Sequence, residues 1–107
     1  MKKVDFPQGA LELLVLRILS HEPNHGFAIA QKIHILSKEI LTVEEGSLYP
    51  ALHRMEKRKW ITSEWGTTAK NRRAKYYSLT KSGEDTLAEQ TASWKLLSDA
   101  MDYVLQG

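Results

Sequence analysis

The sequence predicts a small, mainly helical domain that has one β-hairpin and ends in a long helix. Three observations lead to this fold class. The 107 residues give room for one domain, and 42% hydrophobic with 26% charged residues is an ordinary globular composition. Apolar residues recur at helical spacing in the first half of the chain and again at its end. A stretch rich in aromatic and β-branched residues lies between these two regions and favours strands.

The composition and motifs exclude several classes of site. The chain has no cysteine, which excludes disulfides, thiolate nucleophiles and cysteine-bearing metal sites. No metal or cofactor is expected, because Pro23 interrupts the helix that would align His21 with His25. No serine-nucleophile motif or phosphate loop is found, so an enzyme is not expected. The start MKKVDFPQG lacks an apolar stretch, so neither a signal peptide nor a membrane span is expected.

Charge is unevenly distributed along the chain, although the net charge is only +2. Residues 53–75 contain eight basic and two acidic residues, a balance of +6. Residues 84–107 contain one lysine and five acidic residues, a balance of −4. The sequence therefore predicts one basic face and a negatively charged C-terminal end. A solvated charged surface without a partner is the alternative.

Two apolar helices are predicted ahead of the basic segment. The first covers residues 9–20 and is so rich in leucine that it should be covered on two sides. A turn at Pro23 and Gly26 follows, because proline lacks a backbone donor and glycine can adopt positive φ. The second helix begins near Phe27. Its predicted buried face consists of Ile29, Ile33, Leu36 and Ile40.

The third helix has two candidate starts. Thr42 with Glu45 fits a capping box, but this start places Pro50 well inside the helix, where it costs about 3 kcal/mol. Ser47 as the N-cap leaves Pro50 in the first turn, so this start is expected. The outward face of the helix then presents Tyr49, Pro50, His53, Arg54 and Lys57.

The rest of the chain predicts a hairpin and a long helix. Residues 60–65 and 74–80 favour strands, and the basic loop 66–75 joins them. The last helix begins at Thr80 and can run to about Gln106, with an apolar seam at a spacing of seven residues. This order of elements is that of a winged helix-turn-helix in residues 1–80, followed by a dimerisation helix in residues 81–107, as one continuous fold.

Three segments carry a specific resemblance. They are GFAI at 26–29, EGSLYPALHRME at 45–56 and RRAKYYSLTKSG at 72–83. In content and spacing they resemble the N-terminal domain of the PadR family of bacterial transcriptional regulators, over roughly residues 9–87. The resemblance implies a winged-helix DNA-binding repressor that acts as a homodimer, in a short subgroup with a single C-terminal helix. Two residues depart from the family pattern: Lys59 replaces the usual glycine, and Phe27 the usual tyrosine.

The third helix is the expected recognition helix, because its length fits the major groove and its first residues can reach base edges. Ser47 can cap this helix, contact a phosphate, or do both. The basic hairpin loop can enter the minor groove or stay solvated, and its place beside a recognition helix favours DNA contact. The side on which Lys75 lies depends on strand alternation. The expected DNA-binding residues are Ser47, Tyr49, Pro50, His53, Arg54, Lys57, Lys70, Asn71, Arg72, Arg73 and Lys75.

The last helix is expected to pack against a second subunit. At ~1.5 Å per residue, about 25 residues span ~37 Å, which exceeds the ~30 Å diameter of a small domain. We expect a two-fold homodimer whose recognition helices lie about 34–36 Å apart and bind a palindrome. The expected interface consists of Leu11, Leu14, Ile18, Leu87, Trp94, Leu97, Met101 and Val104.

Trp94 leads to a further expectation. In multidrug-binding members resembling this subgroup, a tryptophan from each terminal helix stacks on flat aromatic ligands, so Trp94 with Met101 can form an effector pocket. Plain interface packing is the alternative. The expected function is a cytoplasmic, nucleoid-associated repressor that binds double-stranded DNA, needs no membrane, and can be released by a planar aromatic small molecule. A dimeric protein-interaction adaptor without a DNA role is the competing hypothesis.

Overall fold

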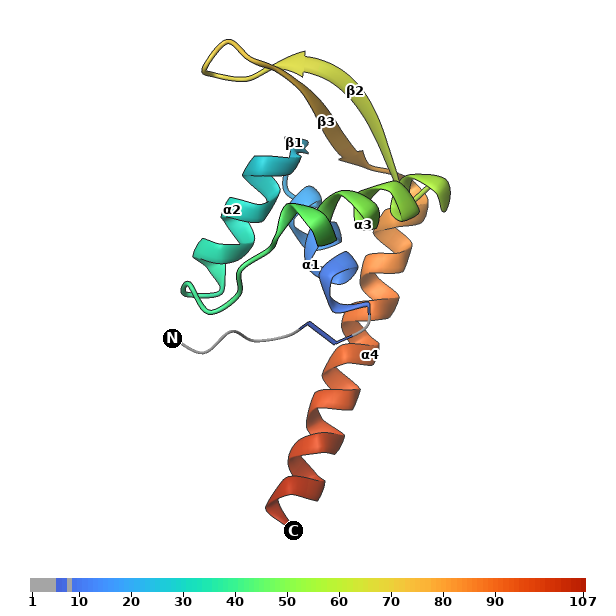
Figure 1. Cartoon of the computed structure of the whole chain (residues 1–107). Helices are drawn as coiled ribbons and strands as arrows, with labels where there is room; N and C mark the ends of the chain where they lie inside the picture. The colour runs from blue at the N-terminus through green and yellow to red at the C-terminus, as the bar shows by residue number, and fades with distance from the viewer. Residues whose placement is uncertain (1–5, 8) are drawn as a thin grey trace.

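The computed structural model describes residues 6, 7 and 9–107, so the expectations for the MKKVDFPQG start fall mostly outside the described residues. Its elements form a winged helix-turn-helix with a long C-terminal helix, which confirms the predicted fold class (Figure 1). The elements are α1 (Ala10–Leu19), β1 (Asn24–His25), α2 (Gly26–Leu36), α3 (Glu45–Lys57), β2 (Ile61–Thr67), β3 (Arg73–Leu79) and α4 (Lys81–Gln106).

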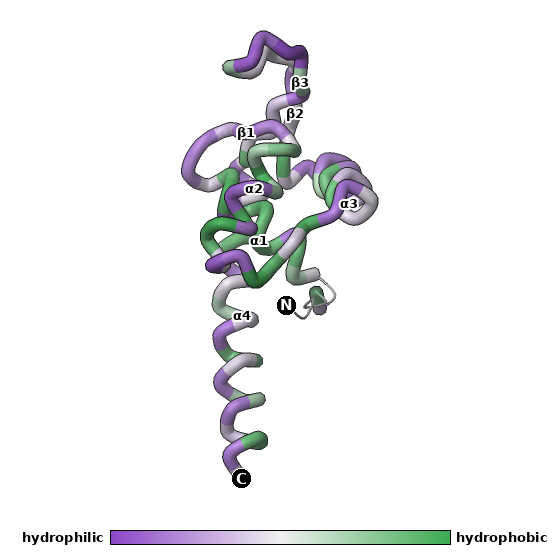
Figure 2. Tube along the Cα trace, turned by 60° about the vertical axis from the view of Figure 1, so that its left-hand side comes forward, coloured by the Kyte–Doolittle hydropathy of each residue, from purple (hydrophilic) through white to green (hydrophobic). Residues whose placement is uncertain are grey.

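The core is built around α1, which packs against α2, α3 and α4. Val15 and Leu16 of this helix have no exposed surface, as expected for a helix covered on more than one side. Each fully buried side chain of this kind stabilises the fold by about 1.5–3 kcal/mol. Figure 2 shows the hydrophobic residues gathered around α1 and α2, whereas the hairpin tip is hydrophilic. The buried cluster consists of Leu11, Val15, Leu16, Ile18, Leu19, Ile29, Ile33, Leu48, Ala51, Leu52, Met55, Ile61 and Tyr77.

α2 ends earlier than its apolar pattern predicts. Ile29 and Ile33 are buried as expected, but Leu36 and Ile40 are exposed, so their predicted place on the buried face is wrong. The reason is local. Ser37 follows the last helical residue, and its hydroxyl accepts a hydrogen bond from the Leu41 N–H at 3.0 Å. Residues 38 and 39 then adopt left-handed φ values of 58° and 65°, which turns the chain away from the helix axis.

α3 begins before the expected N-cap. Its first residue is Glu45, and the Glu44 carbonyl accepts the Ser47 N–H at 3.0 Å, so the assignment of Ser47 as N-cap is wrong. Pro50 consequently lies inside the helix rather than in its first turn. It removes the donor that would pair with the Gly46 carbonyl, and Gly46 is exposed, so water can replace that donor. Burial of the apolar face of α3 offsets the cost.

The end of α3 is a Schellman motif with lysine in the left-handed position. Lys59 has a φ of 64°. The Trp60 N–H donates to the Met55 carbonyl at 3.1 Å, and the Lys59 N–H donates to the Glu56 carbonyl at 3.0 Å. The helix therefore ends as a glycine-terminated helix does, although the Cβ of Lys59 costs roughly 1 kcal/mol in this conformation.

β2 and β3 form the predicted hairpin, which we call the wing. Their register runs from the Ile61–Leu79 pair to the Thr67–Arg73 pair, so the loop spans only residues 68–72. The expected loop of residues 66–75 was longer, because composition alone does not reveal how far the strands stay paired. The Thr68 N–H donates to the Arg72 carbonyl at 2.7 Å and closes this loop.

β1 completes an antiparallel sheet of order β1–β3–β2. Its two residues, Asn24 and His25, pair with Tyr77 and Tyr76 of β3. The sequence predicted only a turn here, because two residues are too few to show strand periodicity. This short strand fixes the start of α2 against the base of the wing.

α4 starts as predicted and projects away from the domain (Figure 1). The Thr80 hydroxyl accepts the Gly83 N–H at 3.0 Å, as an N-cap does. Gly83 is buried, and a Cβ there would collide with the Trp60 carbonyl, so α4 begins in close contact with the end of α3. From residue 92 onward the side chains of α4 are exposed.

Candidate nucleic-acid interface

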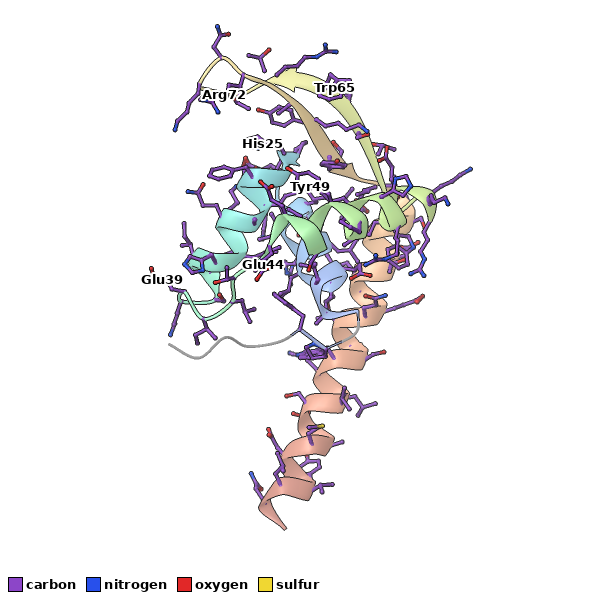
Figure 3. All side chains as sticks on the ribbon, viewed as in Figure 1. His25, Glu39, Glu44, Tyr49, Trp65 and Arg72 are labelled. Carbon is purple, nitrogen blue, oxygen red and sulfur yellow. The ribbon has the colours of Figure 1, made fainter. Side chains whose placement is uncertain are left out.

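The residues expected to bind DNA lie on α3 and on the wing. The wing projects beyond α3 at the end of the molecule opposite the C-terminus (Figure 3). Those on α3 are all exposed: Ser47, Tyr49, Pro50, His53, Arg54 and Lys57. On the wing, three belong to the loop and two to β3: Lys70, Asn71, Arg72, Arg73 and Lys75.

A groove of about 780 Å³ separates the wing from the first turns of α2 and α3. On one side its wall is formed by Gly26 and Phe27 of α2 and by Tyr49 of α3. The opposite wall is the wing, with aromatic and cationic side chains. This combination suits a polyanion, because cations supply charge and aromatic rings supply rigid contact area. The residues of the wing wall include Trp65, Lys70, Arg72, Arg73 and Lys75.

Strand alternation settles on which side Lys75 lies. Arg73, Lys75 and Tyr77 occupy alternate positions of β3 and therefore share one face. Tyr77 is buried in the core, so this face turns toward the helices. Lys75 and Arg73 consequently line the groove instead of the outer face of the wing.

Trp65 is a site residue that sequence reasoning missed. It pairs with Lys75 across the hairpin, and the Arg73 guanidinium carbon lies 4.7 Å from its ring centroid. The Lys75 Nζ lies 6.0 Å from the same centroid. Such exposed cation–π contacts stabilise by about 0.5–1 kcal/mol each. The sequence showed Trp65 only as a strand former, and the hairpin register was the signal that could have connected it with the two cations.

Tyr49 is held in place by a glycine. A Cβ added to Gly26 would lie 2.7 Å from the Tyr49 hydroxyl oxygen and 2.9 Å from its ring carbons, so any side chain there would displace the Tyr49 ring. The phenol ring thus rests directly on the first turn of α2. Gly26 was predicted only as a turn residue, yet it determines where a recognition-helix side chain lies.

Arg54 is paired with α1. Its Nη2 donates to Glu12 Oε2 at 3.3 Å, and Glu12 is only 15% exposed while Arg54 is 51% exposed. The ion pair orients the guanidinium and partly neutralises it, which was not foreseen from the sequence. An exposed pair of this kind contributes about 0.2–1 kcal/mol. It also connects the recognition helix to α1, the helix around which the core is built.

His25 and Tyr77 shape the base of the groove. His25 Nδ1 accepts the Ala28 N–H at 3.4 Å as the N-cap of α2, so the neutral ring has its proton on Nε2. Its ring meets Tyr76 edge-on, with 5.3 Å between centroids. Burial raises the pKa of the Tyr77 hydroxyl, and nearby Glu56 and Tyr49 raise it further. Tyr77 therefore adds no charge to the groove at neutral pH.

The described residues form neither a metal site nor a membrane-spanning helix. Over residues 6, 7 and 9–107, no three His, Asp or Glu side chains are grouped so that they could hold a metal ion. In the same described part of the chain, no helix has the length and apolarity needed to cross a membrane.

The expected dimer residues divide into three groups by burial. Leu11 and Ile18 lie in the core of their own chain, so little of either side chain remains for the partner contact that was expected. Leu14 and Leu87 are half-buried. The α4 seam is different, because its large apolar side chains are exposed. These are Trp94, Leu97, Met101 and Val104.

Comparison with known proteins assigns the fold to a family. The family described as Transcriptional regulator PadR-like family matches residues 15–89. A PadR-like transcriptional regulator from Bacillus cereus is 34% identical with a TM-score of 0.78, and the match covers 94% of this chain and 95% of that one. The protein smu.1704 from Streptococcus mutans UA159 is 32% identical with a TM-score of 0.82, over 97% of this chain and 95% of its own.

A curated relative agrees with this assignment. Transcriptional regulator YqjI of Escherichia coli (strain K12) is 28% identical over 94 residues, which cover 88% of this chain and 44% of that protein. PadR-like proteins are transcriptional regulators and not enzymes; they bind DNA and typically dimerise. The match of the family over most of the winged helix and the overlap with its solved members show that the chain belongs to the PadR-like family of transcriptional regulators.

Proposed function

We propose that this protein is a sequence-specific repressor that binds double-stranded DNA as a homodimer, with α3 in the major groove and the wing beside it. One observation supports this most: Tyr49, on the exposed face of α3, and the cations of the wing line a single groove from its two sides. A phosphate backbone that follows the groove meets Lys75 and Arg73 on one side and Tyr49 on the other. Its position on DNA would associate the protein with the nucleoid.

The start of α3 divides the proposed contacts into two kinds. Glu45 lies in the first turn and disfavours a phosphate at this helix end, although its carboxylate can accept a hydrogen bond from cytosine N4. We therefore assign base-edge contacts to the first turns, where Ser47 and Pro50 are exposed, and a backbone contact to Tyr49, which lines the groove. His53 contributes from the next turn. Phosphate contacts then come from Lys57, from the free side of Arg54, and from the wing residues Lys70, Asn71, Arg72, Arg73 and Lys75.

The α4 seam supports the dimer. Trp94, Leu97, Met101 and Val104 are exposed along one side of a helix that extends beyond its own domain. Burying the exposed part of each of these side chains against a second copy stabilises the dimer by at most about 1.5–3 kcal/mol. Leu14 and Leu87 can extend this contact at the base of α4. Two winged helices joined in this way would bind a palindromic operator with half-sites about 34–36 Å apart.

We further propose an effector pocket at the same seam. Trp94 is half-exposed at the level where α4 leaves the domain, and Met101 lies two turns further along. Two symmetry-related Trp94 rings can enclose a planar aromatic molecule, whose binding would change the spacing of the recognition helices. Titration with planar cationic dyes should quench tryptophan fluorescence in the wild type and much less in Trp94→Ala. Equal quenching in both proteins would remove the pocket from the proposal.

The salt dependence of DNA binding tests the main proposal against a protein-binding adaptor. With six to ten phosphate contacts, duplex affinity should fall by about 10³–10⁵ between roughly 50 and 200 mM salt. DNase footprinting on genomic fragments selected by the purified protein should show a protected inverted repeat. A flat salt response without a footprint would support the adaptor and end the repressor proposal.

A further inference from the structure

Three side chains form one cluster on the groove face of the wing: Trp65, Arg73 and Lys75. Trp65 and Lys75 are directly paired across the hairpin, and Arg73 pairs with Thr67, the next residue of β2 on the same face. The indole ring therefore has one cation beside it and another diagonal to it. The Arg73 Cζ is 4.7 Å and the Lys75 Nζ 6.0 Å from the ring centroid, within the range of a cation–π contact.

Core packing does not account for the Trp65 ring. The side chain is 59% exposed and is not part of the buried cluster, unlike Ile61 and Tyr77 on the same face of the sheet. The ring also lines the groove between the wing and the helices together with both cations. The two cations that lie over the ring thus also line the proposed DNA path; Figure 3 shows Trp65 on the wing.

Long cationic side chains lose rotamer freedom when they bind a phosphate, and this loss weakens the contact. An aromatic face that already holds the cations reduces the loss, because their position is restricted before DNA arrives. The face carries negative electrostatic potential but no net charge, so the cations stay available to a phosphate oxygen.

We propose that Trp65 is a positioning residue of the DNA interface, which holds Arg73 and Lys75 on the groove face so that both meet one DNA backbone. This inference rests on the proposed DNA-binding function. The indole does not itself contact the bases in this arrangement. Its contribution passes through the two cations and disappears when they are absent.

The geometry is tested first without DNA. In NMR spectra of the full-length protein, ring currents should shift the Arg73 side-chain protons upfield, and Trp65→Leu should abolish that shift. Trp65→Phe should retain part of it, because phenylalanine offers a weaker cation–π face. Thr62→Ala is the matched control, since Thr62 is an exposed residue on the opposite face of the same strand. An unshifted Arg73 in the wild type would overturn the proposal.

The role is tested by a mutant cycle on a mixed-sequence duplex of about 40 base pairs at low salt, where binding is mainly electrostatic. Trp65→Leu should weaken binding about fivefold, Trp65→Phe about twofold and Thr62→Ala not at all. In an Arg73→Ala/Lys75→Ala background, Trp65→Leu should have no further effect. The same fivefold loss in both backgrounds would mean direct contact between the ring and DNA, and no loss in either would mean no role; each result overturns the proposal.

The two proposals fail in distinguishable ways. If the wild type binds no duplex although Arg73 shows its upfield shift, the proposed DNA-binding function is wrong. The proposed role of Trp65 in DNA binding is then wrong as well. If the wild type binds DNA and Trp65→Leu binds equally well, only the role of Trp65 is wrong.

Discussion

At the residue scale, two positions in contact with α3 or at its end depend on whether the residue is glycine. Gly26 leaves room for the Tyr49 ring, whereas Lys59 occupies a left-handed position that favours glycine. The missing side chain at Gly26 lets the Tyr49 ring pack against α2. The side chain of Lys59 is retained although it costs conformational energy at a positive φ. Both can be examined by single substitutions that leave the core unchanged.

Gly26→Ala should impair DNA binding more than folding. The new Cβ overlaps the end of the Tyr49 side chain, so the ring swings away while the backbone of α2 stays helical. We expect about tenfold weaker duplex binding, with a melting temperature within a few degrees of wild type. Gly46→Ala is the stability control, because a Cβ there meets nothing within 4 Å. Unchanged affinity in Gly26→Ala would show that the placement of Tyr49 is irrelevant to binding.

Lys59→Gly should stabilise the protein. Removing the Cβ at a φ of 64° relieves roughly 1 kcal/mol, which corresponds to a rise of about 4–8 °C in melting temperature for a domain of this size. Thermal unfolding followed by circular dichroism measures the shift. Lys57→Gly in the last turn of α3 should act in the opposite direction, by about 1 kcal/mol. A lower melting temperature for Lys59→Gly would indicate that the lysine side chain has a stabilising contact.

At the element scale, the Glu12–Arg54 pair connects α1 with α3 at the edge of the core. α1 also packs against α4, so one helix contacts both the recognition helix and the helix proposed to dimerise. Through α1, the pair therefore connects the recognition helix with the helix that supports α4.

Glu12→Gln should release the Arg54 guanidinium. Loss of the ion pair should lower stability by no more than about 1 kcal/mol, because the arginine is half-exposed. Duplex affinity should rise about two- to fivefold, since a phosphate no longer competes with a carboxylate. Isothermal titration with wild type, Glu12→Gln and the α4 control Glu89→Gln measures this change. Weaker binding in Glu12→Gln would mean that the pair orients Arg54 productively.

The elements also show which parts of the structure a sequence can predict. α4 was predicted at both ends, because Thr80 is a good N-cap and the apolar seam is long. The start of α3 was not, because the rule that disfavours proline inside a helix was outweighed by burial of the apolar face. The contact of Trp65 with Arg73 depends on strand register, and that of Tyr49 with Gly26 on how two helices pack. Periodicity carries neither kind of information.

At the scale of the whole molecule, the proposed dimer depends on one side of α4. Leu97 lies on the seam with Trp94, whereas Leu96 is rotated by about 100° from Leu97 around the helix and lies outside the seam; both are exposed. These neighbours therefore form a matched pair of positions with different expected roles.

Leu97→Lys should break the dimer and Leu96→Lys should not. A lysine buried at a two-fold seam lacks a counter-ion and should weaken dimerisation by about 3 kcal/mol, or more than 100-fold. Sedimentation velocity across a concentration series measures the monomer–dimer equilibrium, and a palindromic duplex measures the accompanying loss of affinity. Equal effects of the two substitutions would place the interface elsewhere.

The charges at the two ends of the molecule have a kinetic consequence. The basic wing and the acidic end of α4 lie far apart on a molecule that extends 54 Å along its longest axis (Figure 1). Such a separation gives the subunit a large electric dipole moment, and the field of a nearby duplex exerts a torque on it. The protein would rotate wing-first during diffusional approach, so that more collisions are productive and the association rate falls as ions screen the field.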